Sequence, residues 1–271
     1  MKIPFNLSGL EIIVDSEKIP RLLSDNPELD DALRAHYEKL AEQQEISSSS
    51  PEITLTTDFS LEEKPTHWQL TGVPYRDGIY LVELYNQLLP SRTQDKHIED
   101  RIANPDKPYI VDAPFHHSIF ATLFKNKDHP RYKEQVELVR KFLDKNLKAT
   151  WLSTSSRARY NPAGLDLVIH GVGLPERYET QANLVAPDRF ATSEDDKALQ
   201  AMYKADSQEI IQVHNWLTKV NPYIFRLNTK LRDNPEERVV GFDAYSSRSG
   251  LSWRYLLGSD PAFGVRARKI S

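Results

Sequence analysis

The chain has 271 residues, of which 39% are hydrophobic, 10% aromatic and 27% charged, and its formal net charge is −4. This composition is typical of a folded globular protein and excludes a disordered chain, while the length allows one large domain or two modest ones. The absence of cysteine excludes disulfides, thiolate metal sites and cysteine nucleophiles. No apolar run reaches the length of a membrane span and the first residues lack the apolar stretch of a secretory signal, so we expect neither.

The N-terminal part of the chain predicts alternating strands and a helix. In chain order, we expect a strand over residues 1–14, a helix that begins at Asn26-Pro27, a loop over 46–51 and a strand over 52–57. A helix is expected over 79–89, although its aromatic and branched residues leave a strand open, and 107–112 is expected to form a short strand.

Two later segments carry the clearest helical patterns. After Pro130, apolar residues recur at helical spacing with charged residues on the opposite face, at Tyr132, Val136, Val139, Leu143 and Leu147. A second helix is expected over 206–220, with Asp206 as its N-cap and Glu209 completing a capping box.

Strands are expected over 149–154 and 165–170, and the chain beyond residue 222 has the short strands and turns of a sheet-and-loop region. The sum is an α+β protein. We expect residues 1–150 to form an N-terminal α+β region, either separate or part of the same domain, and residues 151–271 to form a ligand-binding region.

The segment 238–271 combines a regular apolar frame with irregular contents. Val239-Val240-Gly241-Phe242 begins the frame and Ala262-Phe263-Gly264-Val265 ends it, while large aromatics, arginines and small polar residues lie between. Such a mixture is typical of recognition surfaces and is not the set that a single reaction requires, so we expect a binding protein and not an enzyme. This segment contains six cationic and two acidic residues, which give it a charge of +4, while the rest of the chain carries a charge of −8.

Five ordered motifs extend this interpretation. They are Asp166-Leu-Val-Ile-His170-Gly171, Pro175-Glu-Arg-Tyr-Glu179, Pro222-Tyr-Ile-Phe-Arg226-Leu-Asn228, Glu237-Arg238-Val-Val and Gly264-Val-Arg266-Ala-Arg268. Over residues 160–271 the chain resembles the variable proteins of diversity-generating retroelements, of a kind met in archaea, their viruses and small-genome bacteria. The closing Gly-Val-Arg is moderately specific and the ordered series is much more so; residues 1–150 have no counterpart.

The resemblance implies a C-type-lectin-like fold, related to formylglycine-generating enzymes, with helical N-terminal additions. In that family a reverse transcriptase copies a template with errors at adenines and rewrites the 3′ end of the gene, and the rewritten side chains form an exposed ligand-binding surface. The implied partner is a protein or glycan, on a cell surface if the protein serves host attachment; a virion or a cell surface is the corresponding location. Oxidation of a substrate cysteine, the chemistry of the related enzymes, uses active-site cysteines that this chain lacks.

The resemblance carries over ten positions as variable, ligand-binding residues: Asp243, Tyr245, Ser247, Arg248, Gly250, Ser252, Trp253, Arg254, Tyr255 and Asp260. It assigns fixed supporting roles to Val240, Phe242, Leu251, Phe263 and Val265. Trp253 and Tyr255 suit recognition because they offer large contact area at little entropic cost, and their alternative role is as core residues beside a turn.

Other chemical sites are weaker. Asp166 and His170 are expected on one strand face and are the residues that an enzyme would use, but no third partner is identifiable, so we interpret them as an internal hydrogen-bonded pair. The adjacent His116 and His117 would point apart on a strand, so we expect no metal site there, and no cofactor. The run 153–156 is similar to the strand serines of ADP-ribosyltransferases but follows no arginine strand, and we interpret it as a strand end. A nucleic-acid partner is disfavoured because no helix carries a basic motif.

Overall fold

The computed structural model describes residues 2–7, 10–15, 59–192, 195–244 and 248–271. By its contacts the chain divides into two compact units, Met1–Thr56 and Thr57–Ser271. The described part of the first unit is an antiparallel hairpin of β1 (Lys2–Leu7) and β2 (Leu10–Asp15). The single strand expected over 1–14 is therefore two strands. The helix expected from Asn26, the loop over 46–51 and the strand over 52–57 lie outside the described residues.

The second unit contains a four-stranded sheet with the strand order β13-β5-β4-β3, antiparallel throughout. Its strands are β3 (Leu61–Glu63), β4 (His67–Tyr75), β5 (Gly78–Arg92) and β13 (Asp260–Lys269). The last strand of the chain thus pairs with β5, nearly 180 residues earlier in sequence. This pairing holds the C-terminal end of segment 238–271 in place.

A seven-stranded sheet has the order β8-β7-β6-β11-β12-β10-β9, and β10 and β12 are its parallel pair. The strands are β6 (Leu152–Tyr160), β7 (Asp166–His170), β8 (Tyr178–Ala182), β9 (Arg189–Phe190), β10 (Pro222–Ile224), β11 (Glu236–Ala244) and β12 (Ser249–Arg254). Strands were expected over 149–154 and 165–170, and β6 and β7 occupy these regions with shifted bounds.

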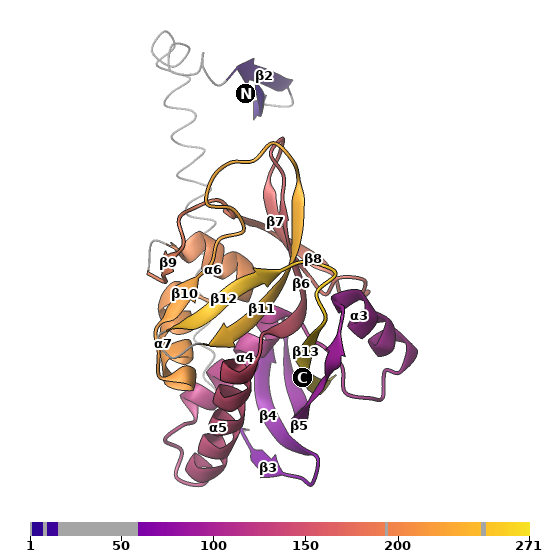
Figure 1. Ribbon diagram of the computed structural model, residues 1–271, viewed down its shortest axis with the longest axis vertical. Coiled ribbons are helices and arrows are strands. Elements are labelled where there is room, and N and C mark those ends of the chain that lie inside the picture. Colours follow the sequence, from indigo (N-terminus) through magenta and orange to yellow (C-terminus); the bar gives the residue numbers. More distant parts are fainter. Residues whose placement is uncertain (1, 8–9, 16–58, 193–194, 245–247) are drawn as a thin grey trace. The chain divides into compact units, whose positions relative to one another are not determined.

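The described helices of this unit are α3 (Gln94–Ala103), α4 (Ala113–Lys125), α5 (Lys133–Ala149), α6 (Asp196–Tyr203) and α7 (Ser207–Thr218). Figure 1 shows α4, α5 and α7 beside the two sheets. Helix α4 contacts β4, β6 and α7, while α5 contacts β11 and β3, so these helices link the sheets. The fold class α+β is confirmed.

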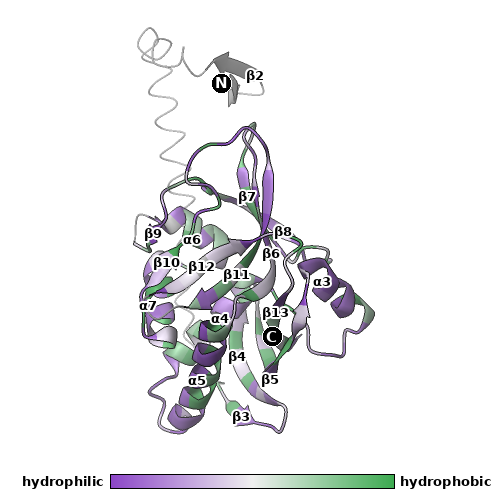
Figure 2. Cartoon of the chain, viewed as in Figure 1, coloured by the Kyte–Doolittle hydropathy of each residue, from purple (hydrophilic) through white to green (hydrophobic). Residues whose placement is uncertain are grey.

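Both strongly patterned helices are confirmed. Tyr132 is the N-cap residue of α5, and the remaining four residues of its predicted apolar face are at most 1% exposed. Figure 2 shows the green and purple sides that this alternation produces along α5. At the start of α7, the Asp206 carboxylate accepts a hydrogen bond from the Glu209 N–H at 2.8 Å, as the capping pattern predicts.

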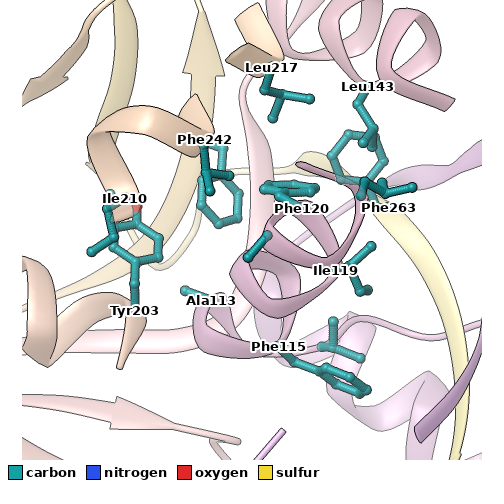
Figure 3. Packing of buried hydrophobic residues seen from close by; sticks show 14 of the residues in the cluster. Ala113, Phe115, Ile119, Phe120, Leu143, Tyr203, Ile210, Leu217, Phe242 and Phe263 are labelled. Atoms are coloured by element: carbon teal, nitrogen blue, oxygen red, sulfur yellow. The ribbon is translucent and has the colours of Figure 1, made fainter. Parts of the chain in front are cut away.

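The core gathers around Phe120 of α4 (Figure 3). Its ring lies 5.8 Å from that of Phe242 on β11 and 6.3 Å from that of Phe263 on β13, measured between centroids. Phe242 and Phe263 are both 1% exposed. Aromatic contacts at these distances stabilise beyond the area that they bury. Residues on either side of position 150 therefore share one hydrophobic core.

The first half of this unit departs from the expected elements. Residues 79–89 form strand β5, the alternative to a helix that the sequence left open, because β4 and β13 hydrogen-bond to it on both sides. Residues 107–112 form an isolated bridge, Tyr109 to Val265, and end in Asp112, the N-cap of α4. His116 and His117 lie on α4 and not on a strand, and both are buried.

Candidate functional site

The predicted variable residues that the structure describes lie on β11, on β12 and directly beside its two ends, and at the first residue of β13. Arg254 is exposed at the end of β12, and Tyr255, directly after it, is 71% exposed. In the loop that leads to β13, Leu257 is 88% exposed. We call residues 254–257 the loop patch. Tyr245 and Ser247 lie outside the described residues.

The Tyr255 ring is covered on one side by an arginine. The Arg238 guanidinium carbon of β11 lies 3.5 Å from the ring centroid, a cation–π contact. Arg238 also pairs with Glu236 on the same strand. Because Arg238 is held by this ion pair, it orients the otherwise exposed Tyr255.

One face of the β11–β12 pair packs on the core. Val240 and Phe242 point into it with exposures of 0 and 1%, and Trp253 lies opposite Val240 on the same face. Trp253 is half-buried, packs against the core and donates its Nε1–H to the Phe225 carbonyl. Trp253 is therefore largely a supporting residue, which is the alternative that the sequence left open for it. Phe263 and Val265, also expected as supports, are buried on β13.

On the opposite face Trp151 covers the centre of the strand pair. Its indole Nε1–H donates to the Ser252 hydroxyl at 2.7 Å, and Ser252 is only 9% exposed. A Cβ atom on Gly241 would lie 2.3 Å from the Trp151 ring, so this contact requires glycine at 241. Ser252 accordingly does not reach the surface, because Trp151 lies over it.

Asp243 and Gly250 are also buried, directly opposite each other on the two strands. A Cβ on Gly250 would lie 1.7 Å from Asp243 Oδ1, so the absence of a side chain at 250 makes room for the carboxylate. Asp243 is 7% exposed. These two positions, with Ser252, do not contribute to the exposed surface.

Arg248 and Asp260 are half-buried, one before β12 and one after it. The Arg248 guanidinium lies 4.7 Å from the Tyr223 ring and 4.8 Å from the Phe225 ring. The Asp260 carbonyl accepts a hydrogen bond from His97 Nε2 at 3.0 Å. Burial raises the pKa of the Asp260 carboxyl, and Arg254 opposes this shift.

Asp166 and His170 of β7 have separate partners. The Asp166 carboxylate accepts from the backbone N–H groups of Asn161 and Leu184. His170 is fully buried, and its Nε2 bonds to the Ala201 carbonyl at 2.9 Å while its Nδ1 bonds to the Ser156 hydroxyl at 2.8 Å. Because a carbonyl only accepts, Nε2 carries the proton and Ser156 donates to Nδ1. Burial lowers the His170 pKa to about 4, so the ring is neutral at pH 7.

A cavity of about 190 Å³ lies where β4, the start of α4 and β6 meet, and sequence patterns did not predict it. Its buried lining residues are Tyr75, Val111, Asp112, Phe115, Ser155 and Gly171. Arg76, Arg101 and Glu176 line its more exposed part. We call it the Ser155 cavity. The signal for part of it was present, since Asp112-Ala113-Pro114 is an N-cap followed by an early proline.

Inside this cavity the Tyr75 hydroxyl donates to Asp112 Oδ2 at 2.5 Å, and the Phe115 N–H donates to Asp112 Oδ1 at 2.9 Å. Burial raises the pKa of Asp112, and these hydrogen bonds oppose the rise. Burial also raises the pKa of Tyr75, which keeps its hydroxyl protonated as a donor. The Tyr75 and Phe115 rings stack with centroids 4.4 Å apart.

Within the described ranges, no group of three or more His, Asp or Glu side chains is arranged to hold a metal ion. Among the helices that the structure describes, none has both the length and the apolar character needed to cross a bilayer. In comparisons with known proteins, no family model, no curated protein and no solved structure matches this chain.

Proposed function

We propose that this protein is a recognition protein that displays segment 238–271 as a ligand-binding surface, on a C-type-lectin-like fold, with sequence variation supplied by a diversity-generating retroelement. The observation that carries the proposal is the contrast between the exposed C-terminal end of β12 and the buried residues of the neighbouring strand β11. Arg254 and Tyr255 are exposed, while Val240 and Phe242 on the neighbouring strand are sealed in the core.

The backbone beneath the loop patch is held from several sides. β11 pairs with β6 as well as β12, and β12 also pairs with β10. The loop then enters β13, which pairs with β5. A substitution at 254, 255 or 257 changes a side chain that the core does not need, so such positions tolerate variation.

The chemistry of the loop patch suits a protein or glycan surface. Tyr255 presents an aromatic ring already stacked by Arg238, so little conformational freedom is lost when a partner binds. Arg254 offers a planar set of hydrogen-bond donors for carboxylates or carbonyl groups. Leu257 adds an exposed apolar side chain. Attachment to a host or partner cell is the role that fits these features.

The decisive experiment is sequencing of the DNA downstream of the gene. The proposal expects a near-repeat of the bases that encode residues 238–271, differing from them at adenines, beside a reverse-transcriptase gene. Sibling genes should differ within codons 243–260 and agree elsewhere. Siblings that differ evenly along their length, with no downstream repeat, would contradict the proposal.

A further inference from the structure

We propose that the Ser155 cavity is a second binding site, separate from the loop patch, and that it takes a small hydroxycarboxylate. The first observation is Ser155 itself. Its side chain is 0% exposed, it lines the cavity, and its hydroxyl has no hydrogen-bond partner among the described residues. A buried hydroxyl without a partner lowers stability, so a ligand group that forms a hydrogen bond with it recovers part of the free energy lost when the hydroxyl was removed from water.

The backbone that carries this hydroxyl is held by two hydrogen bonds. The Ser155 N–H donates to the Val111 carbonyl at 2.9 Å, and its own carbonyl accepts from the Val172 N–H at 3.0 Å. The N–H and the carbonyl of Ser155 therefore both form hydrogen bonds, and their partners do not belong to the neighbouring strands of the sheet. The Cα and Cβ atoms of Ser155 are therefore held beside the cavity.

Two arginines supply the charge that a carboxylate needs. Arg101 donates to the Glu176 side chain, and Arg76 donates to the Glu176 carbonyl at 2.7 Å. Each guanidinium has five N–H donors, more than these contacts use. Glu176 thus holds both arginines at the more exposed side of the cavity, and each can still form paired hydrogen bonds with a carboxylate.

The backbone at Arg76 is unusual. Its φ of +52° is in the left-handed region, which non-glycine residues rarely adopt. The guanidinium stacks 4.0 Å from the Tyr178 ring centroid and 5.2 Å from that of Tyr75. The positive φ belongs to the two-residue turn that joins β4 to β5, in which Tyr75 pairs with Gly78, and this turn places the arginine beside the cavity.

The acceptors of the cavity select for a hydroxyl on the ligand. Asp112 accepts from Tyr75 and Phe115, and an ionised carboxylate has acceptor capacity for further donors. A ligand hydroxyl can donate to Asp112 and also bond to Ser155. Asp112 and Glu176 also disfavour a dianion, because like charges repel strongly in a poorly solvated site. The monoanionic carboxylate is favoured over phosphate for this reason.

The size of the cavity limits the ligand. An engineered cavity of about 150 Å³ binds benzene, which has six non-hydrogen atoms. At about 190 Å³ this cavity therefore suits a molecule only slightly larger. A nucleotide or dinucleotide would not fit inside this volume as a whole.

The test uses the full-length protein with the monoanions glycolate, L-lactate and D-glycerate, the matched neutral compound lactamide, and inorganic phosphate. Binding is measured by isothermal titration calorimetry and by the shift of the melting temperature. At least one hydroxycarboxylate should bind at millimolar concentration while lactamide does not. Ser155→Ala should weaken this binding about tenfold, the effect of one lost hydrogen bond to a charged-ligand site.

Arg76→Gly is the second variant, because glycine tolerates the left-handed backbone and only the guanidinium is lost. It should weaken carboxylate binding more than Ser155→Ala and leave the melting temperature at or above the wild-type value. Ser153→Ala is the matched control, since Ser153 is a buried serine of the same strand that does not line the cavity. It should bind as the wild type does.

Three outcomes overturn the proposal. They are the absence of binding by all three hydroxycarboxylates, binding of phosphate alone, and binding that neither Ser155→Ala nor Arg76→Gly weakens. A hydrated cavity that binds water only would give the first of these. None of them bears on the loop patch, which shares no residue with this cavity.

Discussion

Trp151 donates a hydrogen bond to the Ser252 hydroxyl at 2.7 Å in the interior of the protein, and this contact joins β12 to the start of β6. Ser252 is among the residues that the resemblance marks as variable, yet it lies beneath Trp151 at 9% exposure. Variation at 252 would therefore change the packing of Trp151 as well as any surface. The contact separates positions that are free to change from positions that the fold constrains.

Ser252→Ala is expected to destabilise the protein by about 1–2 kcal/mol, because it leaves the buried Trp151 N–H without its partner. Ser259→Ala, at an exposed serine in the loop before β13, is the control and should lie within about 0.5 kcal/mol of the wild type. Urea unfolding monitored by tryptophan fluorescence measures both. Equal stabilities for the two variants would show that the Trp151 contact contributes nothing.

Trp253→Ala and Tyr255→Ala should distinguish a residue that supports the fold from one that belongs to the exposed surface. Trp253 packs against the core and is expected to cost about 2 kcal/mol of stability, less than a fully buried tryptophan. Tyr255 is 71% exposed and should cost less than about 1 kcal/mol, chiefly through its contact with Arg238. Once a ligand is known, Tyr255→Ala should weaken its binding. A larger loss of stability at 255 than at 253 is the result that this assignment does not allow.

Gly250→Ala should destabilise by about 1–3 kcal/mol, because the new Cβ must displace the Asp243 carboxylate. In an Asp243→Ala background the same substitution should cost less than half as much, since the obstructing group is gone. A double-mutant cycle of unfolding free energies measures this coupling. Additive effects would mean that the two side chains do not compete for the same space.

Three buried histidines predict loss of stability in acid. Burial lowers the pKa of His116 and His170 to about 4 and that of His214 to about 3. These folded-state values lie below the unfolded value of about 6.5, so the stabilisation is complete above pH 6.5 and falls as the pH drops below it. At pH 5 each histidine accounts for a loss of about 2 kcal/mol, and the three together for about 6 kcal/mol.

The measurement is urea unfolding at pH 7.5, 6 and 5. His116→Phe retains an aromatic ring against Phe120, Phe242 and Phe263 but cannot be protonated. Whatever its stability at pH 7.5, its loss between pH 7.5 and 5 should be about one third smaller than that of the wild type. An unchanged pH dependence would assign the acid sensitivity to other groups, such as His97, whose pKa is also lowered by burial.

Local sequence patterns were sufficient for helices α5 and α7. Each helix buries one face and exposes the other, so the helical spacing of Val136, Val139 and Leu143 predicts which face is buried. The same approach missed α4, because ten of its thirteen residues are buried. A helix that is surrounded by protein has no polar face, so its sequence does not show the alternation of polar and apolar residues that identifies an amphipathic helix. It assigned β5 to a helix because its strand partners, β4 and β13, are not visible in a local window.

The sequence alone determined the α+β class, the two amphipathic helices and the apolar frame of the C-terminal segment. Each of these features depends on the pattern of residues that lie close together in the sequence. Tertiary structure decided which residues of that segment reach solvent, since Trp151 covers Ser252 from a hundred residues away and Asp243 occupies the space beside Gly250. It also created the Ser155 cavity, whose residues come from β4, β5, α3, α4, β6 and β13 and from the loops beside them. Burial is set by the partners that folding brings together, and neither composition nor periodicity specifies those partners.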